Sequence, residues 1–250
     1  MTERQTRWLR FSSPPRFHDL AGRLAPGFAI LAVLLFAAGL YAGLVQAPPD
    51  YRQGESYRIL FIHVPAAWMS MFLYVLMAAY AGIGLIWRIK TAEVMAKAIA
   101  PTGALFTFLA LWTGALWGRP TWGAYWVWDA RLTSELILLF LYLGFIALHA
   151  AIEDRQRAAN AGAVLALAGV VNVPVIYFSV TWWNTLHQGA SIRVTSAPSM
   201  DTVMVVALLL MTLACWMYAI AVILWRARLE LLERERRSAW VAERVEEGRV

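Results

Sequence analysis

Long apolar runs separated by short polar breaks dominate the sequence. Six of these runs approach the roughly 20 residues that an α-helix needs to cross about 30 Å of hydrocarbon. A helix in a soluble core rarely stays apolar on all faces over such a length. The pattern therefore predicts an all-α, polytopic membrane helix bundle with six transmembrane helices, at residues 24–47, 59–87, 99–117, 132–151, 161–180 and 201–225.

The composition agrees with this pattern. Of the 250 residues, 60% are hydrophobic and 15% are charged, which lies outside the usual range of soluble globular domains. The first apolar run is too long for the hydrophobic region of a signal peptide, so we expect it to remain as the first helix. A formal charge of +6 would suggest nucleic acid in a soluble protein, but in a membrane chain basic residues also set the orientation.

The basic residues have an uneven distribution. They collect in the N-terminal tail, in the turn 88–97, around Arg155 and Arg157, and after residue 225. The positive-inside rule places these segments in the cytoplasm, with both termini inside and a tryptophan-rich outward loop between helices 3 and 4. The predicted organisation is a cytoplasmic N-terminal tail (1–23), a six-helix transmembrane domain (24–225, with the loop at 118–131) and a cytoplasmic C-terminal tail (226–250).

Several functional classes lack support in the sequence. There is no glycine-rich phosphate loop and no internal repeat, so ATP hydrolysis is not predicted. No charged residue falls in the centre of a span, which argues against the buried charges of many secondary transporters. Cys215 is the only cysteine, so an internal disulfide or Cys-x-x-Cys pair is excluded and a packing role remains.

Two of the four histidines share the outward side. His63 lies at the outer end of the second span and His187 in the last outward loop, whereas His18 and His149 lie toward the cytoplasm and are expected to be structural. A lone histidine at the membrane interface usually places its polar ring nitrogens near water and binds no ligand. A pair is different, because two imidazoles complete a six-coordinate haem iron, while zinc requires three or four ligands. We therefore predict haem, with His63 and His187 as axial ligands of the iron.

The outward loop is rich in tryptophan. An interfacial aromatic belt explains part of this enrichment, but a belt spreads over both membrane faces. A flat apolar macrocycle needs rigid aromatic faces, and Gly123 would let the backbone approach it closely. If the loop is partly helical, Trp122 and Trp126 share a face, with Asp129 close to it. The asymmetry favours a binding surface, because six of the 13 tryptophans fall on or beside the outward loops: Trp117, Trp122, Trp126, Trp128, Trp182 and Trp183.

Four arginines also lie beside the outward loops. Arginine offers charge-assisted hydrogen bonds to the two propionates of haem. A surface salt bridge with Asp50, Glu55 or Asp129 explains such arginines equally well. Both interpretations apply to Arg58, Arg119, Arg131 and Arg193.

The string Trp122-Gly123-x-x-Trp126-x-Trp128-Asp129 resembles the WWD motif of haem-handling proteins in cytochrome c maturation. With His63 before the motif, His187 after it and six spans, the chain is similar to the haem exporter protein C family (CcmC, CycZ or HelC) over roughly residues 20–225. The resemblance implies a site made of the two axial histidines with an aromatic platform and an arginine: His63, His187, Trp117, Trp122, Gly123, Trp126, Trp128, Asp129 and Arg131.

The family resemblance also implies a role and partners. Its members bind haem on the periplasmic side of the bacterial inner membrane and load it onto the haem chaperone CcmE, so haem b is a transient cargo. They work with the single-span subunit CcmD and with the ATP-driven subunits CcmA and CcmB. The slot would expose an edge vinyl of haem to a histidine of the chaperone, and rate would come from positioning. We therefore expect a transfer protein and not an enzyme.

Three rival interpretations differ from this one in the depth of the histidines, the path of haem or the presence of haem. A bis-histidine cytochrome b would hold permanent haems between helices inside the bundle for electron transfer. A haem permease would need a polar path across the membrane, which the sequence does not show. A plain permease or structural subunit would use the aromatic loop only as an anchor and would bind no haem.

Overall fold

The computed structural model describes residues 13–183, 185–187, 199–246 and 248. Within these residues the regular structure is helical, and the only β-type contact is an isolated bridge between Asp50 and Gly54. The α-helices are α2 (Pro14–Tyr41), α3 (Leu60–Trp87), α4 (Lys90–Trp122), α5 (Ala130–Ala151), α6 (Arg155–Gly169), α7 (Asn172–Trp182), α8 (Thr202–Arg234) and α9 (Ala239–Glu246). A π-helical turn, η1 (Ala42–Gln46), extends α2, and a 3-10 turn, η2 (Glu55–Ile59), precedes α3.

In the described part of the chain, six helical stretches are long and apolar enough to cross a membrane, which confirms the predicted class of fold. A helix satisfies most of its own backbone polar groups, as a segment in hydrocarbon must. They are Pro14–Gln46, Glu55–Trp87, Lys90–Trp122, Ala130–Ala151, Arg155–Trp182 and Thr202–Arg234.

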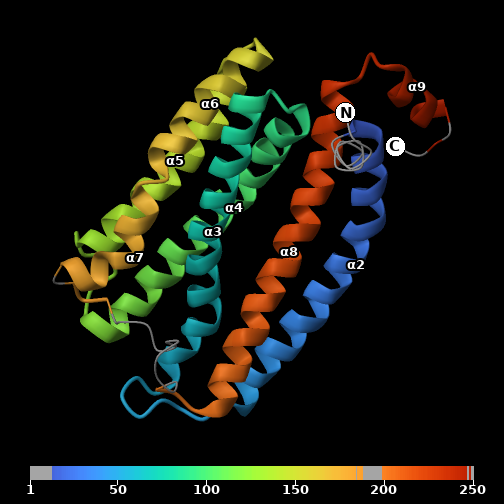
Figure 1. Ribbon diagram of the computed structural model, residues 1–250. Coiled ribbons are helices and arrows are strands. Elements are labelled where there is room, and N and C mark those ends of the chain that lie inside the picture. Colours follow the sequence, from blue (N-terminus) through green and yellow to red (C-terminus); the bar gives the residue numbers. More distant parts are fainter. Residues whose placement is uncertain (1–12, 184, 188–198, 247, 249–250) are drawn as a thin grey trace, which may run out of the picture.

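The helices pack in two groups around α3 and α4 (Figure 1). The α2 helix packs along α8, and α8 in turn contacts α3 and α4. On the other side α5 and α6 pack against α3 and α4, and α7 continues along α5. Tyr74 and Tyr142, both fully buried, meet edge to face in the core between α3 and α5, with ring centres 5.0 Å apart. The resulting bundle has two ends with different chemistry.

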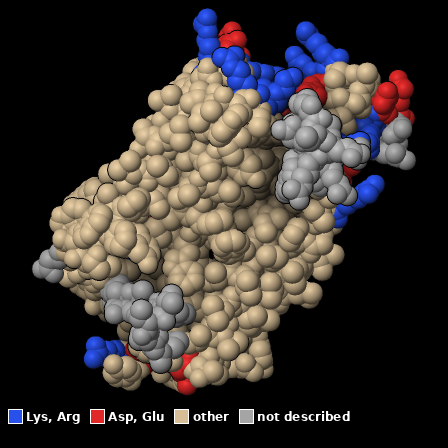
Figure 2. Space-filling model, viewed as in Figure 1, with Lys and Arg blue, Asp and Glu red and all other residues tan. Residues whose placement is uncertain are grey.

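We call the end where α2 begins and α8 ends the terminal end (Figure 1). There, helices are joined by ion pairs: Glu93 of α4 lies 2.7 Å from Arg234 of α8, and Lys97 lies 2.6 Å from Glu230. On the face shown in Figure 2, Lys and Arg gather at this end, and a broad uncharged band follows it. The opposite end, which carries the connection 48–58 and the loop 123–129, is the loop end.

The helices differ from the predicted spans at their ends. The predicted turn 88–97 is wrong: Arg88, with a left-handed φ of 52°, ends α3, and α4 begins at Lys90. Similarly, α2 begins before the first apolar run and α8 continues to Arg234. Apolar runs mark the part that fits in lipid, whereas a helix continues into polar residues where ion pairs support it.

The fifth predicted span is divided in the structure. The α6 helix ends at Gly169 and α7 begins at Asn172, whose Nδ2 donates to the backbone carbonyl of Ser134 at 2.8 Å. Pro174 stands in the first turn of α7, where its missing N–H removes no intrahelical bond. The side chain of Asn172 thus fixes the start of α7 to α5.

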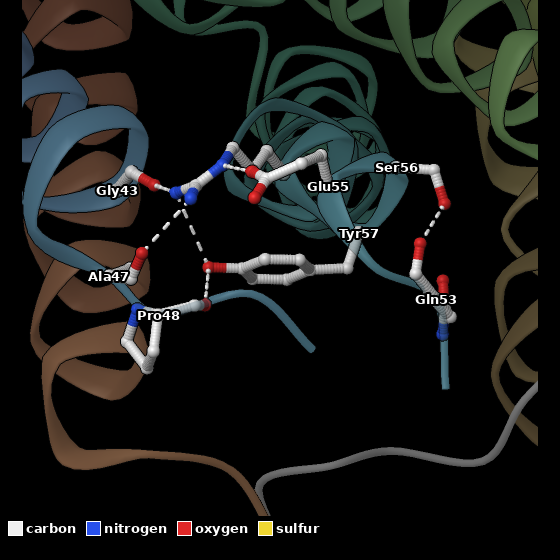
Figure 3. A network of polar contacts seen from close by, with 8 residues as sticks. Gly43, Ala47, Pro48, Gln53, Glu55, Ser56 and Tyr57 are labelled. Atoms are coloured by element: carbon white, nitrogen blue, oxygen red, sulfur yellow. Dashed lines mark hydrogen bonds and ion pairs between the residues drawn. The ribbon is translucent and has the colours of Figure 1, made fainter. Parts of the chain in front are cut away.

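The connection from α2 to α3 is held by Arg58 (Figure 3). Its guanidinium donates to the carbonyls of Gly43 and Ala47 and forms an ion pair with Glu55. The hydroxyl of Tyr57 donates to the carbonyl of Pro48 at 2.8 Å in the same network. Arg58 therefore satisfies carbonyls at the end of the first helix, and the salt bridge with Glu55 that the sequence left open is present.

Candidate functional site

A cleft opens at the loop end between α3, α4, α5 and the segment that follows α7. Its lining combines two imidazoles, two indoles, one arginine and one carboxylate with a threonine and several apolar residues, most of them small. The residues are His63, Ala67, Ala110, Leu111, Gly114, Ala115, Trp117, Thr121, Trp122, Arg131, Leu132, Glu135 and His187.

His63 is held from behind by α4. It lies in the first turns of α3 and is only 8% exposed. Its Nδ1 lies 3.1 Å from Oγ1 of Thr113, and its ring meets Trp117 at 5.6 Å between centres and an angle of 76°. Both neighbours come from α4, so the helix pair α3–α4 sets the orientation of this imidazole.

His187 faces His63 across the cleft. The two ring centres are 6.2 Å apart and the ring planes are tilted by 34°. His187 also lies 6.4 Å from the ring of Trp122, and its backbone N–H donates to Oγ1 of Thr185 at 2.8 Å. The arrangement brings together side chains separated by more than a hundred residues.

The spacing of the two imidazoles fits one metal ion between them. Two ring nitrogens at about 2.0–2.1 Å on opposite sides of a metal place the ring centres roughly 6 Å apart. In the described part of the chain, no group of three or more His, Cys, Asp or Glu residues is placed to hold a metal ion by itself. Two axial nitrogens suit an iron whose other four ligands come from a porphyrin.

Small residues form the wall of the cleft beside His63. Ala67 comes from α3, and Ala110, Gly114 and Ala115 come from α4. A Cβ added at Gly114 would lie 3.0 Å from Cε1 of His63, so only glycine leaves this ring its position. The wall lets a flat molecule approach the helices closely, and the two indoles supply aromatic surface.

Arg131 and Glu135 place charge in the cleft, one helical turn apart on α5. Arg131 donates to the carbonyl of Ile176 at 2.9 Å. Glu135 is only 7% exposed, and its Oε1 accepts a hydrogen bond from Oγ of Ser70 at 2.7 Å. The hydroxyl of Tyr142 in turn donates to the carbonyl of Ser70 at 2.8 Å. A carboxylate is thereby fixed at the deep side of the cleft.

The other arginines have different places. Arg119 donates to the carbonyl of Gly123 and lies over the ring of Tyr125, at 5.8 Å from its centre. Arg58 binds carbonyls in the first connection, and neither side chain lines the cleft. Arg193 lies outside the described residues. Of the three that the structure describes among these four arginines, only Arg131 lines the cleft.

The tryptophan loop borders the cleft without forming a helix. The α4 helix runs through Pro120 to Trp122, and Gly123 ends it with a left-handed φ of 82°. A Cβ at Gly123 would meet nothing within 4 Å, so within the chain its backbone angle, and not close contact, requires glycine. The expectation that Trp122 and Trp126 share a helical face is wrong, because the chain leaves the helix between them.

The rest of the loop presents aromatic surface. Trp128 is 77% exposed and meets Trp126 edge to face, with ring centres 5.3 Å apart. Asp129 caps α5, its Oδ1 accepting from the N–H of Leu132 at 2.8 Å. The indole N–H of Trp126 and Oδ2 of Asp129 are buried and have no hydrogen-bond partner among the described residues.

The predicted site residues thus fall into two sets. His63, His187, Trp117, Trp122 and Arg131 line the cleft, while Gly123, Trp126, Trp128 and Asp129 belong to the loop beside it. Sequence reasoning missed Glu135, Thr113 and the small residues of the wall. A spacing of four between Arg131 and Glu135 was a signal for the first, since it places both on one helical face.

Comparison with known proteins identifies the family. A family model described as Heme exporter protein C matches residues 7–242. The Heme exporter protein C of Haemophilus influenzae is 48% identical over 241 residues, covering 94% of this chain and 96% of its own. That of Bradyrhizobium diazoefficiens is 50% identical over 227 residues, covering 91% and 86%. That of Escherichia coli K12 is 47% identical, covering 93% and 94%.

Similarity extends to a plant organelle protein. A putative cytochrome c biosynthesis ccmC-like mitochondrial protein of Marchantia polymorpha is 46% identical over 158 residues, covering 63% of this chain and 67% of its own. The family match spans all six helices that are long enough to cross a membrane, including those that form the cleft. This chain, a multi-pass membrane protein with paired histidines in an aromatic cleft, belongs to the Heme exporter protein C family.

Proposed function

We propose that this protein holds haem b as a transient cargo in the cleft and passes it to the haem chaperone CcmE during maturation of c-type cytochromes. The names of its relatives support haem handling in cytochrome c maturation. His63 and His187 are the axial ligands in this proposal, and Trp117 and Trp122 cover the macrocycle. Arg131 is the arginine placed to meet a propionate.

One observation carries the proposal. Two imidazoles face each other with ring centres 6.2 Å apart, at the spacing that one iron between them requires. Nδ1 of His63 contacts Thr113, so Nε2 is the ring nitrogen that this proposal assigns to the metal. The pair lies at the loop end and not in the middle of the bundle, which favours an accessible, exchangeable haem over the permanent haems of a cytochrome b.

The loop beside the cleft is the proposed meeting place with the chaperone. Trp128 and the neighbouring Tyr125 are both largely exposed, and exposed aromatic surface of this kind is typical of protein interfaces. The N–H of Trp126 and a carboxylate oxygen of Asp129, which have no partner among the described residues, add a donor and an acceptor that haem or a partner can engage. In this arrangement the cleft presents one edge of the haem to the chaperone.

Orientation follows from charge. The terminal end carries most of the basic side chains on the face of Figure 2, and such an excess favours the cytoplasmic side. We therefore place the terminal end in the cytoplasm and the cleft on the periplasmic side of the inner membrane.

The proposed role is transfer without chemistry by this chain. Energy for releasing the loaded chaperone would come from the ATP-driven subunits CcmA and CcmB, and the single-span CcmD would join the complex. The protein would act by holding haem in a fixed geometry, and this positioning alone would accelerate the transfer of haem to the chaperone. It would not be an enzyme in its own right.

Absorption spectra test the ligands. We would purify the protein from a haem-replete host and compare wild type with His63→Ala, His187→Ala and the matched control His149→Ala, whose ring packs on Phe145 outside the cleft. We expect a Soret band typical of two axial imidazoles in wild type and control, and its loss or shift in both cleft variants. A wild type without a Soret band would contradict haem binding. A band unchanged in the cleft variants would contradict only the ligand assignment.

A second comparison tests the platform. Trp122→Ala combined with Trp126→Ala should lower haem retention or chaperone loading while membrane insertion stays intact, because the variant removes aromatic surface but replaces neither histidine. Unaltered loading would reduce the loop to an interfacial anchor.

A further inference from the structure

Thr113 lies behind His63, on the side away from the cleft. Its Oγ1 is 3.1 Å from Nδ1 of His63 and 2.5 Å from the backbone carbonyl oxygen of Leu109, one turn earlier in α4. Thr113 is not among the residues that line the cleft. Its contact therefore bears on the orientation of the imidazole and not on the cargo directly.

The direction of these hydrogen bonds follows from counting protons. A threonine hydroxyl has one proton to donate and two lone pairs to accept with. A carbonyl oxygen only accepts, so the short contact to Leu109 requires the hydroxyl proton. Toward His63 the hydroxyl must then accept, and Nδ1 of the imidazole must carry the proton. In neutral imidazole a proton on Nδ1 leaves Nε2 with its lone pair, and Nε2 is the nitrogen free to bind a metal.

We propose that Thr113 is a positioning residue that holds His63 in the Nδ1–H tautomer, with Nε2 presented to the cleft. The inference rests on the proposed function insofar as Nε2 binds the haem iron. It extends that function by naming the residue that prepares this ligand before haem arrives. A hydrogen bond from the distal N–H of a metal-bound imidazole also raises the basicity of the ligand, which stabilises the more oxidised metal.

The neighbouring residue leaves room for this arrangement. Gly114 has no side chain, and a Cβ there would press on Cε1 of the His63 ring. Adjacent positions of α4 therefore supply the hydrogen bond and the space. Trp117, one turn further on, closes the other side of the ring at 5.6 Å.

The first test needs no haem. ¹⁵N spectra of histidine-labelled protein in lipid nanodiscs distinguish the two neutral tautomers, and the His63 signals are identified by their loss in His63→Ala. We expect the Nδ1–H tautomer in wild type and in Thr113→Ser, which keeps the hydroxyl. In Thr113→Val, which has a similar shape but no acceptor, we expect a mixture of tautomers. A single unchanged tautomer in the valine variant would overturn the proposal.

The second test uses the haem-loaded protein. Loss of a partner behind a metal ligand typically lowers metal affinity about 10–100-fold, so haem should leave Thr113→Val faster than wild type by roughly this factor. The midpoint potential should rise, because the less basic imidazole stabilises ferric iron less well. Thr113→Ser should restore both values. A variant that loosens packing alone would fail to be rescued by serine.

The outcomes separate this inference from the proposed function. If the apo spectra show the expected tautomers but no haem binds to wild type, Thr113 still orients His63. The proposal that haem is the cargo is then refuted. If haem binds with two axial histidines and Thr113→Val keeps the wild-type tautomer, off-rate and potential, the cargo stands and the role of Thr113 is refuted. Thr113→Ala serves as a second variant should valine prevent folding.

Discussion

The two ends of the bundle use polar side chains in different ways. At the terminal end, charges pair with one another across helices, as Glu93 does with Arg234 and Lys97 with Glu230. In the cleft at the loop end, two polar side chains are each bonded to a side chain of a neighbouring helix and also line the cavity. His63 is held by Thr113 and Glu135 by Ser70, and each keeps its remaining side toward the cleft. Mutual pairing serves stability, whereas support behind a group that lines the cleft prepares that group for a ligand.

The largest expected effect on stability lies at the terminal end. In Arg234→Met, Glu93 remains buried at 8% exposure, with Gln156 as its remaining side-chain partner at 3.2 Å. Removing one member of a buried ion pair costs about 3 kcal/mol at the lower end of the measured range, which applies because Arg234 is partly exposed. Thermal unfolding in detergent should show this loss, while the Soret band of the remaining folded protein stays as in wild type.

The matched control for that variant is Lys97→Met. This lysine pairs with Glu230, but the two side chains are 39% and 26% exposed. Exposed pairs contribute less than about 1 kcal/mol. An equal loss in both variants, or an altered haem spectrum in either, would contradict the division of roles between the two ends.

Gly114→Ala, in contrast to Arg234→Met, should act mainly on haem binding. The added Cβ would lie 3.0 Å from Cε1 of His63, so the imidazole must turn or move. Overpacking of this kind costs about 2 kcal/mol, which corresponds to roughly thirtyfold weaker haem binding if the strain is expressed in the site. Haem titration of the purified protein measures the change.

Gly27→Ala is the control for glycine replacement. A Cβ at Gly27 of α2 would meet nothing within 4 Å, so haem affinity should stay unchanged. Stability should rise by up to about 1 kcal/mol from helix propensity. Equal haem affinity in wild type and Gly114→Ala would show that His63 does not need its observed position.

Much of the fold, and the side of the bundle on which the cleft lies, could be predicted from the sequence. Apolar runs identified the six membrane helices, because length and hydropathy decide what crosses a bilayer. Topology then placed His63 and His187 on one side, which was sufficient to expect them near each other. Their spacing across the cleft could not be predicted, because it depends on how α3 and the segment after α7 pack.

The end of α4 and the roles of Glu135 and Thr113 could not be predicted from the sequence, for identifiable reasons. The end of the apolar run at residue 117 suggested a loop from residue 118, yet α4 continues through Pro120 to Trp122. Glu135 was overlooked, since hydropathy averages hide one carboxylate in an apolar run. Thr113 has no sequence signal at all, because a threonine in a membrane helix ordinarily bonds its own preceding turn. The position of His63 gives its hydroxyl a further partner on another helix.

The smallest expected effect separates two roles of Asp129. Both Asp129 at the loop end and Asp154 at the terminal end cap a helix, accepting from the N–H of Leu132 at 2.8 Å and of Arg157 at 2.7 Å. Replacing either with alanine should cost about 1 kcal/mol in thermal unfolding, since an N-cap is lost in both. Only Asp129→Ala should also lower haem transfer to the chaperone, because Asp154 caps α6 far from the cleft.

Asp129→Asn then isolates the charge. Asparagine caps a helix about as well as aspartate, so stability should stay within about 0.5 kcal/mol of wild type. Transfer should nevertheless fall, because the carboxylate oxygen that has no partner among the described residues is replaced by a neutral amide. Transfer at the wild-type rate would leave Asp129 as a helix cap alone. The acidic residue of the motif would then serve the same purpose as Asp154, and the contrast between the two ends would rest on the cleft and not on the loop.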